Sequence, residues 1–174
     1  MDTTNHLLLP VRASDHAHGP QDAPHTIVEY GDYQCADCGS LYTVLRDLQN
    51  HIGRRLRVVF RHYPLSGIHP HAQQAAEAAE AAGAQGKFWE MHSILFEKQD
   101  ALRTKDLIRY AEDIALDTEL FRQALKRETY RDQVRADFIA GVQNGVNGTP
   151  GLFLDSVRYD GPRDSEALQT LLEI

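Results

Sequence analysis

Two strand patterns separated by one helix pattern constrain the fold of this chain more than any other feature. The run HTIVEY at 25–30 is rich in β-branched and aromatic residues and is bounded by Pro24 and Gly31, which is typical of a strand between two turns. Apolar residues then recur at helical spacing over 41–52, and RLRVVFRHYP at 55–64 predicts a second strand. These elements form a β-α-β unit, whose second strand returns parallel to the first.

Helical periodicity fills the middle of this chain of 174 residues. It begins at about residue 69 and continues to about residue 146. The first predicted helix of this stretch has small side chains on one face, at Ala72, Ala75, Ala76, Ala79 and Ala82. Such a face lets helices pack closely, so we expect four or five helices in succession.

Strand patterns return after the helical stretch and predict one interrupted domain. They occupy 152–155 and 157–160 and suggest a short hairpin or two sequential edge strands, and a helix pattern closes the chain. We therefore expect an α/β fold with an inserted all-helical subdomain. The core is predicted to contain residues 1–66 and 147–174, and the helical insertion residues 67–146.

Charge and hydropathy exclude several partners. With a formal net charge of −7 and scattered Lys and Arg residues, the sequence lacks the basic face that nucleic-acid phosphates require. The N-terminal stretch MDTTNHLLLP has an acid where secretory signals are positive, and its apolar run is three leucines. No apolar run approaches the roughly 20 residues of a membrane-spanning helix. Unless an export signal has been removed, we expect a cytoplasmic monomer without membrane or nucleic-acid partners.

Both cysteines of the chain, Cys35 and Cys38, lie at the N-terminus of the helix in the β-α-β unit. A thiol there faces unpaired backbone N–H groups and the positive end of the helix dipole, and both stabilise the thiolate. Because the thiolate is the attacking species, Cys35 is the predicted nucleophile. Cys38, one turn further into the helix, can displace Cys35 from a mixed disulfide or close the ring.

Two other roles for the cysteine pair stay open. A zinc site needs four ligands, and the chain offers histidines in the stretches HAH (16–18) and HPH (69–71). These stretches lack the spacing of about three to five residues that is typical of zinc modules. A purely structural disulfide would close a small loop and constrain the unfolded chain little. A C-x-x-C between strand and helix therefore favours redox chemistry, with no bound metal or cofactor.

Three stretches together carry a resemblance to a known family. They are VEYGDYQCADCG, HPHAQQAAEAAEAAGAQGKFWEMHSILF and NGVNGTPGLFLD, and the chain resembles the DsbA-like branch of the thioredoxin superfamily over most of its length. The resemblance implies a thioredoxin-like fold with the helical segment as a lid beside the cysteines. It also implies a cis peptide bond between Thr149 and Pro150, whose backbone helps to hold an extended substrate segment, although most X-Pro bonds are trans.

Glu29 is the third site residue that the resemblance implies, since the family keeps a carboxylate six residues before the first cysteine to exchange protons with the inner one. A buried carboxylate without a partner has a raised pKa, which suits this role near neutral pH. The alternative is a glutamate at the strand end that reaches solvent. We expect Asp32 to be a solvated turn residue and His62 to be a surface or capping residue.

The dipeptide between the cysteines departs from the family. It is Ala36-Asp37, whereas strongly oxidising members have a histidine there that stabilises the thiolate. A negative charge at Asp37 favours the protonated thiol and offsets part of the helix-dipole effect. We therefore predict a reduction potential of about −180 to −230 mV, below the value of about −120 mV of the strongest oxidants.

The sequence therefore predicts a thiol-disulfide oxidoreductase that exchanges a Cys35–Cys38 disulfide with protein thiols through a mixed disulfide on Cys35. Its partners would be protein or small-molecule thiols and disulfides. Two alternatives remain, a glutathione- or peroxide-linked thiol reductase and a metal-binding module that uses the two thiolates.

Overall fold

The computed structural model describes residues 5–172, in which a mixed sheet carries helices on both faces. Its strands are β1 (His16–His18), β2 (His25–Gly31), β3 (Leu56–His62), β4 (Gly151–Leu154) and β5 (Val157–Tyr159). They are arranged in the order β1-β3-β2-β4-β5. β2 and β3 run parallel, with His25 opposite Leu56, and the other pairs are antiparallel. The predicted β-α-β unit and the late hairpin are confirmed.

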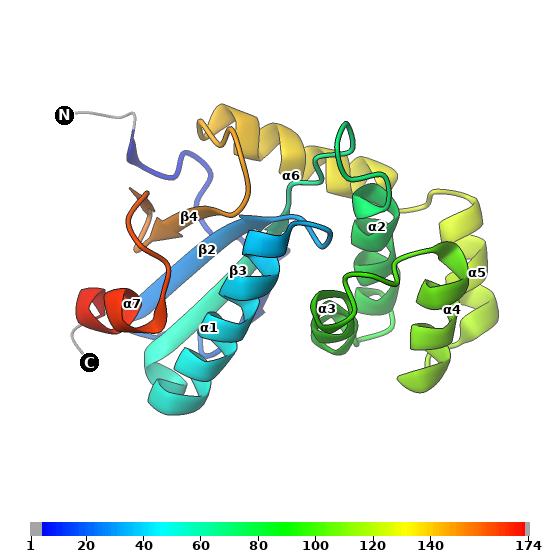
Figure 1. The fold of residues 1–174 in the computed structure, drawn as a ribbon, viewed down its shortest axis with the longest axis horizontal. Coiled ribbons are helices and arrows are strands. Elements are labelled where there is room, and N and C mark those ends of the chain that lie inside the picture. Colours follow the sequence, from blue (N-terminus) through cyan, green and yellow to red (C-terminus); the bar gives the residue numbers. More distant parts are fainter. Residues whose placement is uncertain (1–4, 173–174) are drawn as a thin grey trace.

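Seven α-helices accompany the sheet in the described part of the chain. They are α1 (Ala36–Ile52), α2 (Ala72–Gly83), α3 (Phe88–Glu97), α4 (Thr104–Asp113), α5 (Thr118–Lys126), α6 (Arg131–Gln143) and α7 (Ser165–Leu171). Figure 1 shows α2 to α5 grouped beside the sheet, while α6 runs from this group back over the sheet. The predicted α/β fold with inserted helices is confirmed, and the limits of its two parts stay a prediction. Within residues 5–172, no helix is long and apolar enough to span a membrane.

Alternation along the central strands places an apolar core on each face of the sheet. Ile27 and Val58 point to the face covered by α1 and α7, where Leu45 and Leu168 pack on them. On the opposite face, apolar residues of β2, β3 and β4 pack against α6 and the N-terminal segment; they include Leu7, Val28, Val59, Ala140 and Phe153. The sheet is thus buried on both faces. This packing holds the end of β2, which precedes the cysteines, in a defined position.

A third apolar cluster joins the helical segment to this strand end. It contains Tyr33 and Cys38 from the core and Met91 and Leu95 from α3. The predicted small-residue face of α2 is buried, with exposed fractions of 2% or less at Ala72, Ala75, Ala76, Ala79 and Ala82. The helices therefore share a continuous packed interior with the cysteines.

The edge strand β1 was not predicted from the sequence. Its three residues pair antiparallel with β3, His16 opposite Phe60. His16 Nε2 also lies 2.8 Å from Glu80 Oε1 of α2. A strand of this length has too few residues for a period-2 pattern to be recognised. The sequence therefore indicated only a metal-ligand role for the stretch HAH.

Candidate active site

The backbone around the cysteines follows directly from the end of β2. Cys35 has extended backbone angles, φ −76° and ψ 123°, and is the N-cap residue of α1. Its N–H donates to the carbonyl oxygen of Asp32 at 3.1 Å, and its own carbonyl accepts from Gly39 at 3.1 Å. Cys35 is 8% exposed and Cys38 is fully buried, and both thiols are free. The structure therefore places the two sulfurs on the first turn of the helix, as predicted.

The surroundings of the two sulfurs drive their pKa values apart. A hydrogen bond from the Cys38 thiol, supported by the backbone N–H groups of Cys38 and Asp37, lowers the pKa of Cys35 to about 5, while burial opposes this shift. Burial raises the pKa of Cys38 far above its usual range, and its bond to Cys35 and the charge of Glu29 act in the same direction. Cys35 is therefore a thiolate at neutral pH and Cys38 a thiol.

Asp37 contributes to the site through its backbone rather than its charge. Its N–H is one of the groups that lower the pKa of Cys35, whereas its side chain is exposed. Water and salt screen an exposed carboxylate. The charge of Asp37, which the sequence led us to expect would raise the pKa of Cys35, therefore has a smaller effect than the N–H groups of the helix terminus, which lower it.

Thr149 and Pro150 lie directly against the first cysteine. The Cys35 Sγ atom is 3.5 Å from the carbonyl oxygen of Thr149, 114 residues away in the chain. The peptide bond between Thr149 and Pro150 is cis, and Pro150 is buried. The chain then enters β4, which pairs with β2. The pairing of β4 with β2 therefore places the loop of Thr149 and Pro150 beside the sulfur of Cys35.

Glu29 lies in the interior, in the middle of the sheet. It is 2% exposed, and its Oε1 atom has no hydrogen-bond partner among the described residues. Burial raises its pKa to about 8, the Cys35 thiolate adds to this effect, and Arg163 opposes it. Glu29 also lines a cavity of about 130 Å³ together with Gln49 and Trp89, and a water molecule takes roughly 30 Å³. The solvent-reaching alternative for Glu29 is wrong.

The prediction that Asp32 is solvated is also wrong. Asp32 is 1% exposed. Its carboxylate accepts from the backbone N–H groups of Gln34 at 2.7 Å and Leu65 at 2.8 Å, and it lies 2.7 Å from His69 Nδ1. A buried carboxylate is stable when such donors surround it. Asp32 thus joins the cysteine loop to the loop that follows β3.

Gln99, after α3, is a site residue that sequence reasoning missed. Its Nε2 atom donates to the carbonyl oxygens of Tyr33 at 2.9 Å and Cys35 at 2.8 Å. A β-carbon at Gly39 would lie 2.3 Å from Gln99 Oε1, so this approach requires glycine there. A single glutamine at a helix end has no sequence signal of its own, because its partners are more than 60 residues away.

Two histidines near the site, His62 and His92, are buried and contact other side chains of the interior. His62, expected at the surface, is fully buried, and its Nε2 lies 2.7 Å from Glu80 Oε1. His92 is 2.9 Å from the Tyr33 hydroxyl, and burial lowers the pKa of His92 well below its usual range. Trp89 packs beside His92 with ring centroids 4.9 Å apart. Over residues 5–172, no cluster of three or more His, Cys, Asp or Glu side chains is placed to hold a metal ion.

A pair of free cysteines at the first turn of the helix in a β-α-β unit, facing a proline loop before the next strand, defines a protein of the thioredoxin-like class. The sequence model of the family described as Thioredoxin matches residues 12–174. The chain belongs to this family.

Solved structures with similar folds support this assignment. BdbD from Bacillus subtilis in its oxidised form aligns with a TM-score of 0.80 and 24% identity, covering 91% of each chain. A thioredoxin-like oxidoreductase from Silicibacter pomeroyi gives a TM-score of 0.81 and 23% identity, covering 93% of this chain and 92% of that one. The α-DsbA1 protein of Wolbachia pipientis gives 0.80 and 20%, covering 96% and 92%. The resemblance to DsbA-like proteins is confirmed at the level of the fold.

Curated relatives share more sequence but are much longer. A protein of Salinispora tropica named Na(+)/H(+) antiporter NhaA 3 is 45% identical over 163 residues, which are 93% of this chain and 25% of that protein. Na(+)/H(+) antiporter NhaA 1 of Mycolicibacterium vanbaalenii is 40% identical over 170 residues, 96% of this chain and 28% of that protein. The chain spans about a quarter of the length of these relatives.

Proposed function

We propose that this protein is a thiol-disulfide oxidoreductase whose reacting group is the Cys35–Cys38 pair. The observation that carries the proposal is the position of the two sulfurs on the first turn of α1, with Cys35 at the N-cap and Cys38 fully buried. This position separates their pKa values, to about 5 for Cys35 and far above the usual range for Cys38. In such a pair one cysteine is a thiolate that can attack, and the other is a thiol that can later displace it from a mixed disulfide. The similar folds of proteins described as oxidoreductases support the same conclusion.

In the oxidising direction, a substrate thiolate attacks the Sγ atom of Cys35 in the Cys35–Cys38 disulfide. A bond forms between the substrate sulfur and Cys35, and Cys38 leaves as a thiolate. A second substrate thiolate then attacks the substrate sulfur, so that Cys35 leaves as a thiolate and the substrate gains a disulfide. The protein takes up two electrons from the substrate, and the same steps run backwards when it reduces a disulfide.

Glu29 supplies the proton that Cys38 needs in this cycle. A thiolate at Cys38 is unfavourable in its buried position, and a carboxylic acid whose pKa is about 8 is protonated at neutral pH and can donate to it. The cavity beside Glu29 provides room for water that returns the proton. Glu29 therefore acts as the acid when Cys38 leaves and as the base when Cys38 attacks.

Thr149 and Pro150 hold the substrate segment that carries the reacting sulfur. The Thr149 carbonyl already lies 3.5 Å from Cys35 Sγ, so a peptide at the sulfur meets this backbone. Proline has no N–H and cannot compete for the backbone groups of a substrate. An extended segment can therefore pair with the backbone of Thr149, where the only hydrogen bond that the described residues make to the carbonyl oxygen is the long one from Cys35 Sγ.

The proposal is tested by trapping the mixed disulfide. Reduced Cys38→Ser protein is mixed with a peptide disulfide and its mass is measured after acid quenching. A stable adduct of one peptide chain on Cys35 is expected, since no second thiol displaces it. Cys35→Ser protein serves as the control and should carry no adduct. Adducts on neither variant, or on Cys38 in preference, would overturn the proposal.

The names of the curated relatives do not extend this proposal to ion exchange. The chain matches 25% of the Salinispora protein, and the antiporter name describes the whole of that protein. Thiol-disulfide exchange is the chemistry for which this chain itself carries the groups.

A further inference from the structure

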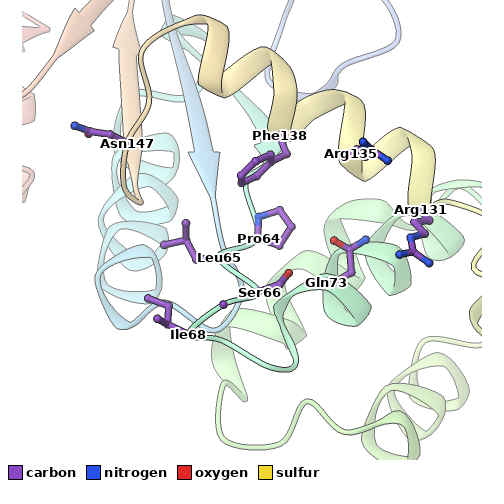
Figure 2. A pocket seen from close by; sticks show the side chains of 10 residues that line it. Pro64, Leu65, Ser66, Ile68, Gln73, Arg131, Arg135, Phe138 and Asn147 are labelled. Carbon is purple, nitrogen blue, oxygen red and sulfur yellow. The ribbon is translucent and has the colours of Figure 1, made fainter.

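A groove with a volume of about 860 Å³ lies between α6 and the loop that follows β3. Its apolar wall contains Pro64, Leu65 and Ile68 from the loop and Phe138 from α6. Figure 2 shows Phe138 pointing from α6 toward Pro64 of the loop. Ile68 is 72% exposed, an unusual position for a large aliphatic side chain beside other apolar groups. Contiguous exposed apolar surface of this kind is typical of binding sites.

One end of the groove lies near the loop that contacts the reacting sulfur. Asn147 lines it and stands two residues before Thr149, so their Cα atoms are at most about 7.6 Å apart. The opposite wall is tied to the cysteine loop, because the N–H of Leu65 donates to the buried Asp32 carboxylate at 2.8 Å. A polypeptide bound at Cys35 therefore reaches the groove within a few residues.

Two arginines give the groove a charge that most of this molecule lacks. Arg131 and Arg135 line it from positions four apart on α6, so they share one face of the helix. Arg131 donates to Glu128 Oε2 at 2.5 Å, but both side chains are more than half exposed, and such surface pairs are weak. No ion pair is formed by Arg135 with the described residues. Arg131 also lies near Glu77 and Asp132, so Arg135 is the cation of this pair whose charge is most available to a bound carboxylate.

Hydrogen-bonding groups between the apolar wall and the arginines suit a peptide backbone. Gln73 uses its amide N–H on Glu77 at 2.8 Å, which leaves its carbonyl oxygen to accept from a peptide N–H. The Ser66 hydroxyl and the Asn147 amide also line the groove and can both donate and accept.

From these contacts we infer that the groove binds an extended segment of a protein substrate, next to its reacting cysteine, that carries a large apolar side chain and an acidic residue. The apolar side chain packs between Ile68 and Phe138, and the carboxylate binds Arg131 and Arg135. The inference rests on the proposed function and names its substrate class.

Rates of thiol oxidation by the disulfide form test the inference. The substrates are two peptides with one cysteine, identical except that Leu-Asp or Leu-Lys stands about five residues away from it, roughly 16 Å in an extended chain, and 2-mercaptoethanol, which is too small to reach the groove. For Arg131→Glu/Arg135→Glu protein we expect at least a tenfold loss of the second-order rate constant with the Leu-Asp peptide, a gain with the Leu-Lys peptide, and an unchanged rate with 2-mercaptoethanol. Ile68→Ser should slow both peptides and leave 2-mercaptoethanol unaffected.

The matched control is Arg122→Glu/Arg127→Glu, which makes the same change of charge at exposed positions outside the groove. Equal losses in this control, or unchanged peptide rates in both groove variants, would overturn the inference. So would an equal loss with glutathione, because the groove would then bind a small anionic thiol. If the unmodified protein fails to oxidise 2-mercaptoethanol, the proposed function itself is wrong, and that result is distinct from any effect of the groove variants.

Discussion

Two intervening residues separate Cys35 from Cys38, yet one sulfur faces donors and the other faces the interior. The N-cap position gives Cys35 the N–H groups of the first helical turn, and the Cys38 thiol adds a further donor. Cys38 is buried, and both its burial and the nearby charge of Glu29 raise its pKa. At the scale of single residues, the chemistry therefore depends on position along one turn of helix more than on the residue type, which is the same at both places.

The reactivity of Cys35 should follow its lowered pKa. Alkylation by iodoacetamide in the reduced protein should rise to half its maximal rate near pH 5, the value to which the pKa of Cys35 is lowered, while Cys38 stays unmodified. Peptide mass mapping after timed quenching separates the two sites. In Cys38→Ala protein this hydrogen-bond donor is lost, and the midpoint should rise. A midpoint at the ordinary value for cysteine, about 8.5, would contradict the thiolate assigned to Cys35.

Glu29 should make the stability of the reduced protein depend on pH. Its pKa is about 8 in the folded protein, against 4.5 for an unperturbed glutamate. Between these values the folded state holds a proton that the unfolded state has released, so stability falls as pH rises and levels off above about pH 8. Glu29→Gln should therefore be more stable at pH 8 by on the order of a few kcal/mol, and the difference should vanish below about pH 4.5.

Urea unfolding at a series of pH values measures this effect, with the exposed Glu90 changed to Gln as the control. The control should follow the unmodified protein at every pH. If Glu29→Gln also follows it, Glu29 is not the buried acid described above. The same variant should resolve mixed disulfides more slowly above about pH 8, where Glu29 of the unmodified protein is ionised and can accept the proton of Cys38 as it attacks.

At the scale of elements, periodicity made β2, β3, the hairpin and the helical stretch predictable, since burial on known faces repeats along each of them. Contacts between different elements produce no repeating pattern in the sequence. Asp32 and His62 looked like surface residues because their partners, Leu65 and Glu80, lie on other elements. The cysteines, Thr149 and Pro150 were found through motifs and resemblance, whereas Gln99 needed the structure.

Gln99 should stabilise the contact between the helical segment and the cysteine loop. Gln99→Ala removes two hydrogen bonds to the carbonyls of Tyr33 and Cys35, and leaves both acceptors less well satisfied. We expect a loss of about 1–3 kcal/mol in the free energy of unfolding, measured by urea denaturation. Gln123→Ala is the matched control, because Gln123 is exposed and its side chain bonds only to Glu119 of the same helix. Equal effects of the two substitutions would contradict the role given to Gln99.

At the scale of the whole molecule, the two ends of the chain build the sheet and the reacting loop, and the middle builds one wall of the groove and one flank of the cysteines. Buried polar contacts join these parts. Glu80 of α2 lies 2.8 Å from His16 of β1 and 2.7 Å from His62 of β3, and these partners hold the pKa of Glu80 down to about 2 although burial opposes them. The helical segment is thus fixed to the sheet that carries the cysteines.

The stabilised thiolate of Cys35 sets the redox poise of the whole protein. A lowered thiolate pKa favours the reduced form and raises the potential. The pKa of about 5 lies between the values of about 7 for thioredoxin and about 3.5 for the strongest oxidant of this fold. The predicted potential of about −180 to −230 mV accordingly lies between the extremes of the fold class.

An equilibrium titration of the cysteine pair against glutathione buffers would show directly whether Cys35 and Cys38 exchange electrons as a pair. The oxidised fraction is read by alkylation and mass, with Cys35→Ser and Cys38→Ser proteins as controls that should show no intramolecular transition. We predict one reversible two-electron transition with a midpoint between about −180 and −230 mV. A midpoint above about −140 mV would contradict the predicted poise, and the absence of any transition would contradict the assignment of Cys35 and Cys38 as an exchanging pair.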